Sequence, residues 1–128
     1  MLLCSNNEGI ILVYRYPELS IINEFVTYKG LRYPKFSPDG KYVATRGNNY
    51  KTTEIWEVST GKKIVSIGPE KQSNNCHIEF TDDSKFFSTA QSTSIGYYIV
   101  IWDLEGNVVY KHKLPRAHLP GSLYLIEE

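Results

Sequence analysis

The sequence lacks the features that mark membrane-spanning, secreted or disulfide-stabilised proteins. Its longest apolar run, residues 10–14, is far shorter than the roughly 20 residues that cross a bilayer, so we expect no membrane association. The opening residues, MLLCSNN, have neither the basic region nor the full hydrophobic region of a signal peptide. Two cysteines, Cys4 and Cys76, are too few for a disulfide framework. We therefore expect reduced cysteines and a cytoplasmic protein.

The sequence also lacks a net charge, because 14 lysines and arginines balance 14 aspartates and glutamates. Basic residues alternate with acidic ones along most of the chain, which is typical of a solvated surface. A protein that mainly binds nucleic acid needs a basic surface, so we expect no nucleic-acid partner. The one cationic cluster is KHKLPR, residues 111–116, which could contact an acidic partner.

Metal-binding and catalytic patterns are absent as well. The chain has three histidines, and His77 directly follows Cys76, so the two side chains point to opposite faces of a strand and cannot share a ligand. His112 and His118 are separated by six positions, which is not a zinc spacing. No nucleophile elbow, phosphate-binding glycine loop or zinc-protease motif occurs. We therefore expect no metal, no cofactor and no enzymatic activity.

An internal repeat is present instead, in a chain with ten tyrosines and five phenylalanines, which favour strands. The segment YPKFSPDGKYVAT, residues 33–45, matches CHIEFTDDSKFFST, residues 76–89. Downstream, the segment around Trp56 matches the segment around Trp102, 46 positions later. A weaker third copy opens the chain, and there Tyr14 takes the tryptophan position.

Each copy predicts short strands separated by turns. Residues 37–40, SPDG, favour a type I turn, and residues 82–84, DDS, fill the same place less well. The segment YYIVIWDL is apolar on both faces, which predicts sheets that are covered on both sides. The predicted strands are 2–5, 10–14 and 21–25 in the first copy; 31–36, 42–45, 53–58 and 63–67 in the second; 76–80, 86–90, 97–103 and 108–113 in the third; and 122–128 alone.

The pieces FSPDGKYVAT, EIWEVSTGK and IVIWDLEGN resemble the WD-repeat family of β-propellers, most closely in residues 31–67. The resemblance implies an all-β fold of propeller blades, each with four antiparallel strands. The family's Gly-His pair is missing, and its turn aspartate is replaced by Glu8, Tyr50 and Gly96. We therefore expect the family's Asp-His-Ser/Thr-Trp hydrogen-bond network to be absent, and other propellers with an SPDGK turn stay possible. The residues expected to pack between blades are Tyr14, Phe36, Trp56, Phe80 and Trp102.

The predicted strands add up to three blade equivalents in a single module, residues 1–128. Residues 1–25 form a partial blade that lacks its innermost strand, residues 31–67 and 76–114 form complete blades, and residues 122–128 form a lone innermost strand. Propellers usually have 4–8 blades. Two solutions follow: two copies exchange these strands in a six-bladed homodimer, or the chain is part of a longer propeller. We favour the homodimer, because the strand count closes and the sequence starts with Met1.

The family resemblance implies a non-catalytic scaffold that binds a protein partner within a larger assembly, although fold alone does not fix function. Polar loops between the second and third strands of a blade, residues 46–52 and 91–98, suit recognition. The candidate contact residues are Arg46, Asn48, Asn49, Tyr50, Tyr97, Lys111, Lys113 and Arg116. One alternative is a ligand or catalytic site in the central channel of a larger propeller. Another is a self-assembling building block with no other partner.

Overall fold

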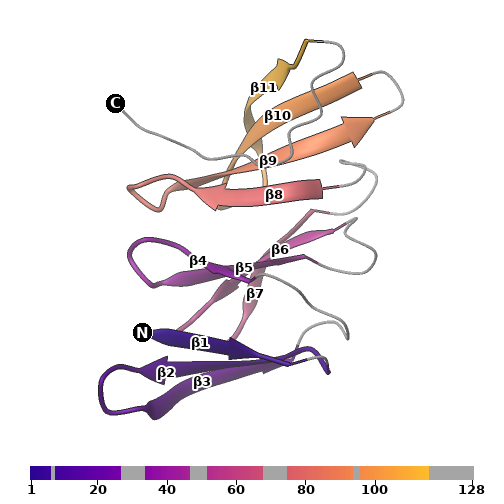
Figure 1. Cartoon of the computed structure of the whole chain (residues 1–128). Coiled ribbons are helices and arrows are strands. Elements are labelled where there is room, and N and C mark those ends of the chain that lie inside the picture. The colour runs from indigo at the N-terminus through magenta and orange to yellow at the C-terminus, as the bar shows by residue number, and fades with distance from the viewer. Residues whose placement is uncertain (7, 27–33, 47–51, 68–74, 94–95, 116–128) are drawn as a thin grey trace.

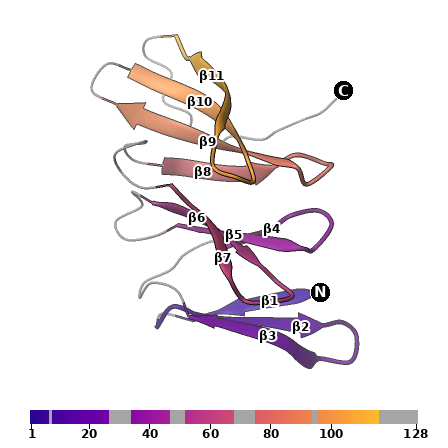
Figure 2. The same cartoon turned by 180° about the vertical axis from the view of Figure 1, so that it is seen from behind.

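The structure is a computed structural model that describes residues 1–6, 8–26, 34–46, 52–67, 75–93 and 96–115. Every element in these ranges is a β-strand, and the strands form three antiparallel sheets stacked one upon another (Figures 1 and 2). Within the same ranges, the structure contains no helix that could cross a membrane. The all-β prediction is confirmed.

The first sheet has three strands and the other two have four each, in simple up-and-down order. The strands of the first sheet are β1 (Leu2–Ser5), β2 (Ile10–Arg15) and β3 (Ser20–Val26). Those of the second are β4 (Lys35–Phe36), β5 (Tyr42–Arg46), β6 (Thr53–Glu57) and β7 (Lys63–Ile67). Those of the third are β8 (Asn75–Phe80), β9 (Phe86–Thr93), β10 (Gly96–Asp103) and β11 (Val108–Lys113). The predicted strand 122–128 lies outside the described residues.

The strand pairing shows that the three sheets are repeats of one unit. Tyr14 lies opposite Leu2, as Trp56 lies opposite Val43 and Trp102 opposite Phe87. In each sheet, the pairing of the last two strands shifts register immediately before this aromatic residue. Such a shift is a β-bulge, which bends its strand and increases the local twist. The same bend therefore occurs at the same place in all three sheets. Tyr14 therefore occupies the tryptophan position, even though the first copy is the weakest in sequence.

The turns between the first two strands of the complete sheets also correspond. The Gly40 N–H donates to the Ser37 carbonyl at 2.9 Å, and Gly40 has a φ of +73°. In the third sheet, the Ser84 N–H donates to the Thr81 carbonyl at 2.9 Å, but a serine holds the left-handed conformation, with a φ of +60°. A residue with a Cβ is less stable there than glycine, which agrees with the poorer turn sequence.

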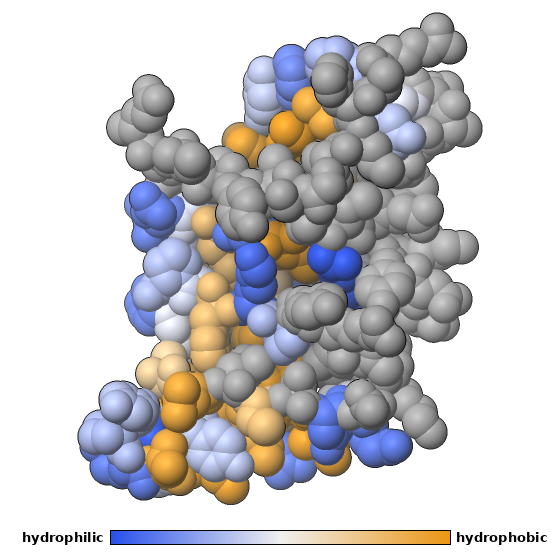
Figure 3. All heavy atoms as spheres, viewed as in Figure 1, coloured by the Kyte–Doolittle hydropathy of each residue, from blue (hydrophilic) through white to orange (hydrophobic). Residues whose placement is uncertain are grey.

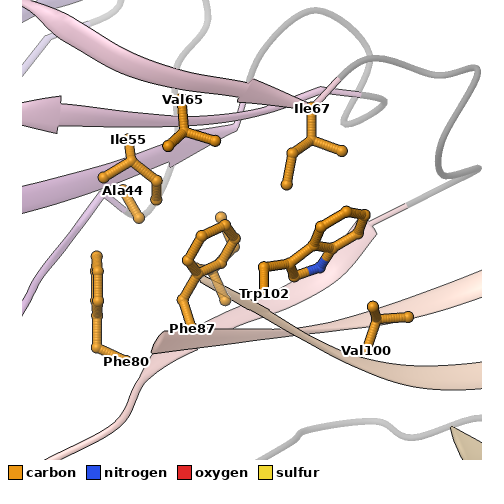
Figure 4. Packing of buried hydrophobic residues seen from close by; sticks show 9 residues of the cluster. Ala44, Ile55, Val65, Ile67, Phe80, Phe87, Val100 and Trp102 are labelled. Carbon is orange, nitrogen blue, oxygen red and sulfur yellow. The ribbon is translucent and has the colours of Figure 1, made fainter. Parts of the chain in front are cut away.

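The hydrophobic core lies in the two interfaces between stacked sheets. We name the interface of the first and second sheets the first seam, and that of the second and third sheets the second seam. Five buried apolar residues fill the first seam: Ile11, Val13, Phe25, Val43 and Val58. Nine fill the second, and Figure 4 shows how they face one another from the two sheets: Ala44, Ile55, Val65, Ile67, Ile78, Phe80, Phe87, Val100 and Trp102.

Both tryptophans lie in the seams and donate a hydrogen bond to a threonine. Trp102 is 1% exposed and stacks against Phe87, and its Nε1 donates to Thr89 Oγ1 at 3.0 Å. Trp56 is half-buried, and its Nε1 donates to Thr45 Oγ1 at 3.0 Å.

The expectation that the Asp-His-Ser/Thr-Trp network is absent is therefore wrong in part. An indole N–H that is removed from water needs an acceptor. A threonine on the adjacent strand supplies that acceptor in both complete sheets. The threonine–tryptophan half of the network is thus present.

Candidate protein-interaction surface

The structure separates the residues that were predicted to form contacts. Asn48, Asn49, Tyr50 and Arg116 lie outside the described residues. Arg46 is half-buried at the end of β5 in the second sheet, opposite Thr53. Tyr97, Lys111 and Lys113 lie together in the third sheet, on β10 and β11. Arg46 and this second group therefore belong to different blades.

The predicted loop at residues 91–98 is mostly strand, which corrects that expectation. Strand β9 continues to Thr93 and β10 begins at Gly96, with Tyr97 opposite Ser92. Backbone pairing extends to Thr93 and Gly96, which lie opposite each other, and Gly96 adopts a φ of +145° that residues with side chains rarely accept. Tyr97 is accordingly a half-buried strand residue, and its carbonyl accepts a hydrogen bond from the Leu114 N–H at 2.8 Å.

The outermost strand of the third sheet, β11, is exposed along its whole length. Val108, Val109 and Tyr110 are 52%, 55% and 57% exposed. One edge of β11 pairs with β10, and the other edge has no strand partner within the described ranges. An exposed edge strand offers unpaired N–H and C=O groups to another chain. We name this strand the β11 surface.

Charged and aromatic side chains divide between the two faces of the β11 surface. Lys111 lies opposite Val100, and its Nζ is 4.5 Å from the Tyr98 ring centroid, which is a cation–π contact. On the other face, the rings of Tyr110 and His112 are parallel, with 6.4 Å between their centroids. The surface therefore combines positive charge, aromatic rings and exposed valines. Interface cores are enriched in aromatic residues.

The two outer faces of the stack carry side chains of the type that fills the seams. On the third sheet, Ile101 occupies the place that Ile55 takes in the second sheet, where it is fully buried. On the first sheet, Tyr14 occupies the place of Trp56 and lies opposite Ile21, which is 60% exposed. Figure 3 shows hydrophobic side chains gathered on the visible surface at the level of the first sheet. Exposed apolar patches of this kind mark interaction sites.

A shallow hollow of about 300 Å³ opens at the first seam, beside the turns. The Asn23 side chain crosses the seam nearby, and its Nδ2 donates to the Val58 carbonyl at 2.8 Å. The hollow is lined by Ile22, Gly40, Lys41, Tyr42, Glu57, Val58 and Ser59.

Two ion pairs lie at the seams. Lys35 on β4 pairs with Glu79 on β8 and so links the innermost strands of the second and third sheets. Glu54 on β6 is 1% exposed, and Lys63 Nζ lies 3.6 Å from its Oε1. Within the described part of the chain, no hydrogen-bond donor reaches either oxygen of Glu54. The described residues also contain no group of three histidine, cysteine, aspartate or glutamate side chains placed to hold a metal ion.

The turns beside the second seam hold an ionised aspartate. Partial burial tends to raise the pKa of Asp39, but hydrogen bonds from Ser37, from the Lys41 N–H and from Ser84 outweigh burial and keep this pKa below 3.8. The Asp39 N–H in turn donates to Ser84 Oγ at 3.1 Å. Because Ser84 belongs to the third sheet, this pair of turns is a polar link across the second seam.

Two further aspartates have lowered pKa values for local reasons. A hydrogen bond from the Thr81 hydroxyl is the main cause for Asp83. The backbone N–H of Asn107 is the main cause for Asp103. Both carboxylates cap turns within their own sheet, and acidic residues are common in turns for this reason. Their lowered pKa values are consistent with turn structure and need no catalytic explanation.

Sequence reasoning missed the exposed valines of β11 and the buried Glu54. The segment VVYKHK shows no alternation of apolar and polar residues that would predict which of its faces is covered. For Glu54, the repeat itself contained a signal. The equivalent position in the third sheet is Val100, two residues before the tryptophan, so the position faces a seam.

Stacked antiparallel sheets, one described with three strands and two with four, have a bulge and an aromatic residue at the same place in each and define a WD-repeat-like β-propeller. Residues 28–119 match the family described as "Eukaryotic translation initiation factor eIF2A". The chain belongs to this family.

Other similar proteins are longer than this chain. WD repeat-containing protein 18 of Danio rerio is 33% identical over 92 residues, which cover 66% of this chain and 20% of that protein. The chain therefore spans about a fifth of this relative.

Solved structures share the fold. A "crystal structure of the eukaryotic initiation factor" matches with a TM-score of 0.64 and 19% identity, over 81% of this chain and 26% of the other. The dihydro-heme d1 dehydrogenase NirN in complex with DHE matches with a TM-score of 0.68 and 17% identity, over 90% and 24%. The hydrazine synthase of Kuenenia stuttgartiensis matches with a TM-score of 0.65 and 20% identity, over 88% and 33%. These similarities concern the fold alone, because propellers serve many functions.

Proposed function

We propose that this chain is a non-catalytic, protein-binding part of a β-propeller that acts in translation initiation in the cytoplasm. The observation that carries the proposal is the β11 surface, where all six residues of an edge strand are exposed. Three of its neighbouring side chains, Val108, Val109 and Tyr110, are large and apolar. Soluble proteins seldom leave such a patch uncovered unless it binds something. Family membership supports the link to translation initiation.

The chemistry of β11 favours an extended, acidic segment of a partner protein. A peptide can add a strand to an exposed sheet edge, where backbone hydrogen bonds provide affinity and side chains provide specificity. Lys111 and Lys113 are both exposed and lie on one face of the strand. They would pair with carboxylates of the partner, while Tyr110 and the valines would be covered by its apolar side chains.

Replacement of Val109 by glutamate tests this proposal. The tagged chain is added to a cell-free eukaryotic translation extract, and the fraction that sediments with initiation complexes is measured on sucrose gradients. We expect at least a 10-fold weaker association, because a hot-spot residue contributes about 2 kcal/mol or more. The matched control is Ile64→Glu, since Ile64 is 40% exposed on the outermost strand of the second sheet. Equal association of the wild type and both variants would contradict a role for β11.

We further propose that two copies of the chain associate head to tail, as a homodimer. Two observations support this. The outer face of the third sheet carries Ile101 where the second sheet carries the buried Ile55, and the outer face of the first sheet carries Tyr14 where the second carries Trp56. The two outer faces are therefore complementary in the same way as the faces that meet in the seams.

Light scattering at micromolar concentration tests this association, and we expect the mass of two chains. In a longer propeller, further blades of the same polypeptide would cover these faces instead. The longer relatives agree with that alternative. A mass of one chain would overturn the homodimer and leave the role of the β11 surface untouched.

A further inference from the structure

We propose that the β11 surface recognises the spacing of acidic residues in its partner and selects an extended segment with carboxylates on two alternate residues. This inference rests on the proposed function of the β11 surface and specifies the chemistry of its partner. It starts from Lys111 and Lys113, two exposed residues that are separated by one position on β11.

Both lysines lie on the side of the third sheet that faces the second seam. Lys111 is opposite Val100 and Lys113 is opposite Tyr98, and residues directly opposite on paired antiparallel strands share a face. Val100 is buried in the second seam, and Tyr98 packs against the same cluster. Because β11 is the outermost strand of its sheet (Figure 2), the two lysines lie at the outer rim of this seam.

Two neighbours on β10 position the lysine side chains. The Lys111 Nζ lies over the Tyr98 ring, 4.5 Å from its centroid, which is a cation–π contact. A Cβ on Gly96 would lie 3.0 Å from Lys113 Cε, so the absence of a side chain at Gly96 gives the Lys113 stem its room. Within the described ranges, neither ammonium group forms an ion pair with a carboxylate. Both charges are therefore held in place and are open to carboxylates of a partner.

The spacing of the two lysines determines the spacing of those carboxylates. A strand rises about 3.3 Å per residue and its successive side chains point to opposite faces, so Lys111 and Lys113 are about 6.6 Å apart along one face. A segment that adds to the edge of β11 has the same period, and its alternate residues lie beside the two lysines. Two adjacent carboxylates would place one of them on the other face, beside Tyr110 and His112. The segment therefore carries its acidic residues at positions i and i+2.

Titration of the full chain with three synthetic peptides tests this spacing. TVEVEVT has glutamates on alternate residues, TVEEVVT has the same composition with adjacent glutamates, and TVQVQVT has glutamines in their place. The valines and threonines give all three peptides a similar tendency to form a strand. The chain is labelled with nitrogen-15, and the NMR amide signals of β11 are followed at low ionic strength, where surface charges are least screened.

We expect the dissociation constant of TVEVEVT to be about 3-fold lower than that of TVEEVVT and about 10-fold lower than that of TVQVQVT. The reason is that each cross-strand pair of opposite charges strengthens binding by a factor of about three. The signals of β11 should change more than those of β7, the outermost strand of the second sheet. Equal constants for the three peptides, or no binding at millimolar concentration, would overturn the inference.

Substitution of the lysines tests which residues make the selection. Lys111→Gln and Lys113→Gln should each weaken the binding of TVEVEVT about 3-fold and leave TVQVQVT unchanged. Lys85→Gln is the matched control, because Lys85 is also exposed but lies in the turn between β8 and β9, and it should change neither peptide. A preference for TVEVEVT that survives both substitutions on β11 would overturn the assignment of these lysines.

The role of Tyr98 as a positioning residue requires a readout that packing alone would not change. Tyr98→Phe keeps the aromatic ring and should bind TVEVEVT as the wild type does. Tyr98→Leu keeps an apolar side chain at the seam but removes the ring, and it should weaken TVEVEVT about 2-fold to 3-fold without affecting TVQVQVT. Equal losses for both peptides in Tyr98→Leu would show a structural role only and would overturn the positioning role.

The outcomes separate this inference from the proposed function. If TVEVEVT is not preferred while Val109→Glu still weakens the association with initiation complexes, the spacing rule is overturned and the proposed function stands. If TVEVEVT is preferred while Val109→Glu leaves that association unchanged, the spacing rule stands and the role of β11 in translation initiation is overturned.

Discussion

The two seams of this stack are built from equivalent strand positions, yet they are filled with different chemistry. Among the described residues, nine buried apolar side chains lie in the second seam and five in the first. Trp102 is fully enclosed in the second seam, whereas Trp56 is half-buried in the first. Buried apolar area is the main favourable term in folding. The second seam is therefore the stronger of the two, and the first sheet is held less firmly than the third.

The largest chemical difference between the seams is a single position of the repeat. Two residues before the tryptophan, the second seam has Val100 and the first has Glu54, and each is 1% exposed. The partner of Glu54 is Lys63, whose side chain is 40% exposed and whose Nζ lies 5.9 Å from the Trp56 ring centroid. Removal of a carboxylate from water costs several kcal/mol unless hydrogen bonds compensate. At this position of the repeat, the buried charged residue therefore lies in the seam with less apolar packing.

Polar contacts follow the same ranking. Two described contacts join the turns or innermost strands across the second seam: the Asp39 N–H to Ser84 Oγ and Lys35 to Glu79. Across the first seam, Asn23 donates to the Val58 carbonyl. Exposed ion pairs contribute little, about 0–1 kcal/mol, so these contacts refine the difference that the apolar packing creates.

The comparison predicts that the two tryptophans differ in their contribution to stability. Trp102→Ala should lower the free energy of unfolding by about 3–5 kcal/mol, the usual cost of an enclosed aromatic residue. Trp56→Ala should cost less, because part of its ring already contacts water. Urea unfolding followed by circular dichroism measures both values. Equal losses of unfolding free energy in the two variants would show that the two seams stabilise the protein equally, and would contradict the ranking of the seams.

The position of Glu54 predicts a gain of stability. Glu54→Val makes the first seam like the second and should raise the free energy of unfolding by about 1–4 kcal/mol, as found when buried charges are replaced by apolar residues of suitable size. Glu24→Val, on an exposed position of β3, is the control and should change it by less than about 0.5 kcal/mol. A loss of stability in Glu54→Val would mean that the pair with Lys63 is net favourable.

The threonine–tryptophan hydrogen bonds predict a smaller contrast. Thr89→Val keeps the shape of the side chain but leaves the enclosed Trp102 N–H without its acceptor, at a cost of about 1–3 kcal/mol. Thr45→Val should cost less, since water can reach the half-buried Trp56. Urea unfolding of the two variants, supported by the tryptophan fluorescence maximum, compares them. A larger loss for Thr45→Val would contradict the ranking of the seams.

Much of this fold was predictable, because each repeat can be recognised in the sequence by its turn residues and by one aromatic position. The SPDG turn and the tryptophan fix the second sheet, and Tyr14 correctly identifies the first despite its weak similarity. The ends of the strands, by contrast, were harder to predict, because backbone pairing can continue into a segment whose sequence favours a loop. The polar residues among 91–98 predict a loop, although strand pairing continues as far as Thr93 and Gly96.

The candidate surface was less predictable. The charge of Lys111 and Lys113 predicts that they are exposed, but the hydrophobicity of their neighbours Val108 and Val109 predicts burial in a core, whereas both valines are exposed. Whether an outermost strand is covered depends on what packs beyond it, which the residues of that strand do not encode. The burial of Glu54 depends in the same way on the first sheet, whose side chains form the opposite wall of the seam. Such features follow from tertiary packing and not from local pattern.

The smallest predicted effect concerns the link between the turns across the second seam. Ser84→Ala removes a hydrogen bond that helps to keep the Asp39 pKa low, so this pKa should rise toward 3.8 in carboxyl NMR titration. The pKa of Asp103, which is lowered by hydrogen bonds from Asn107 and Glu105 and not by one from Ser84, should not change. A carboxylate with a lowered folded pKa stabilises the protein above its unfolded pKa, and this stabilisation is lost as the pH falls through the folded value. The wild type should therefore lose the contribution of Asp39 on acidification below about pH 4, and Ser84→Ala should show a shallower loss. An unchanged Asp39 pKa in the variant would mean that Ser37 and Lys41 hold the carboxylate by themselves, and that the turns do not couple the two sheets.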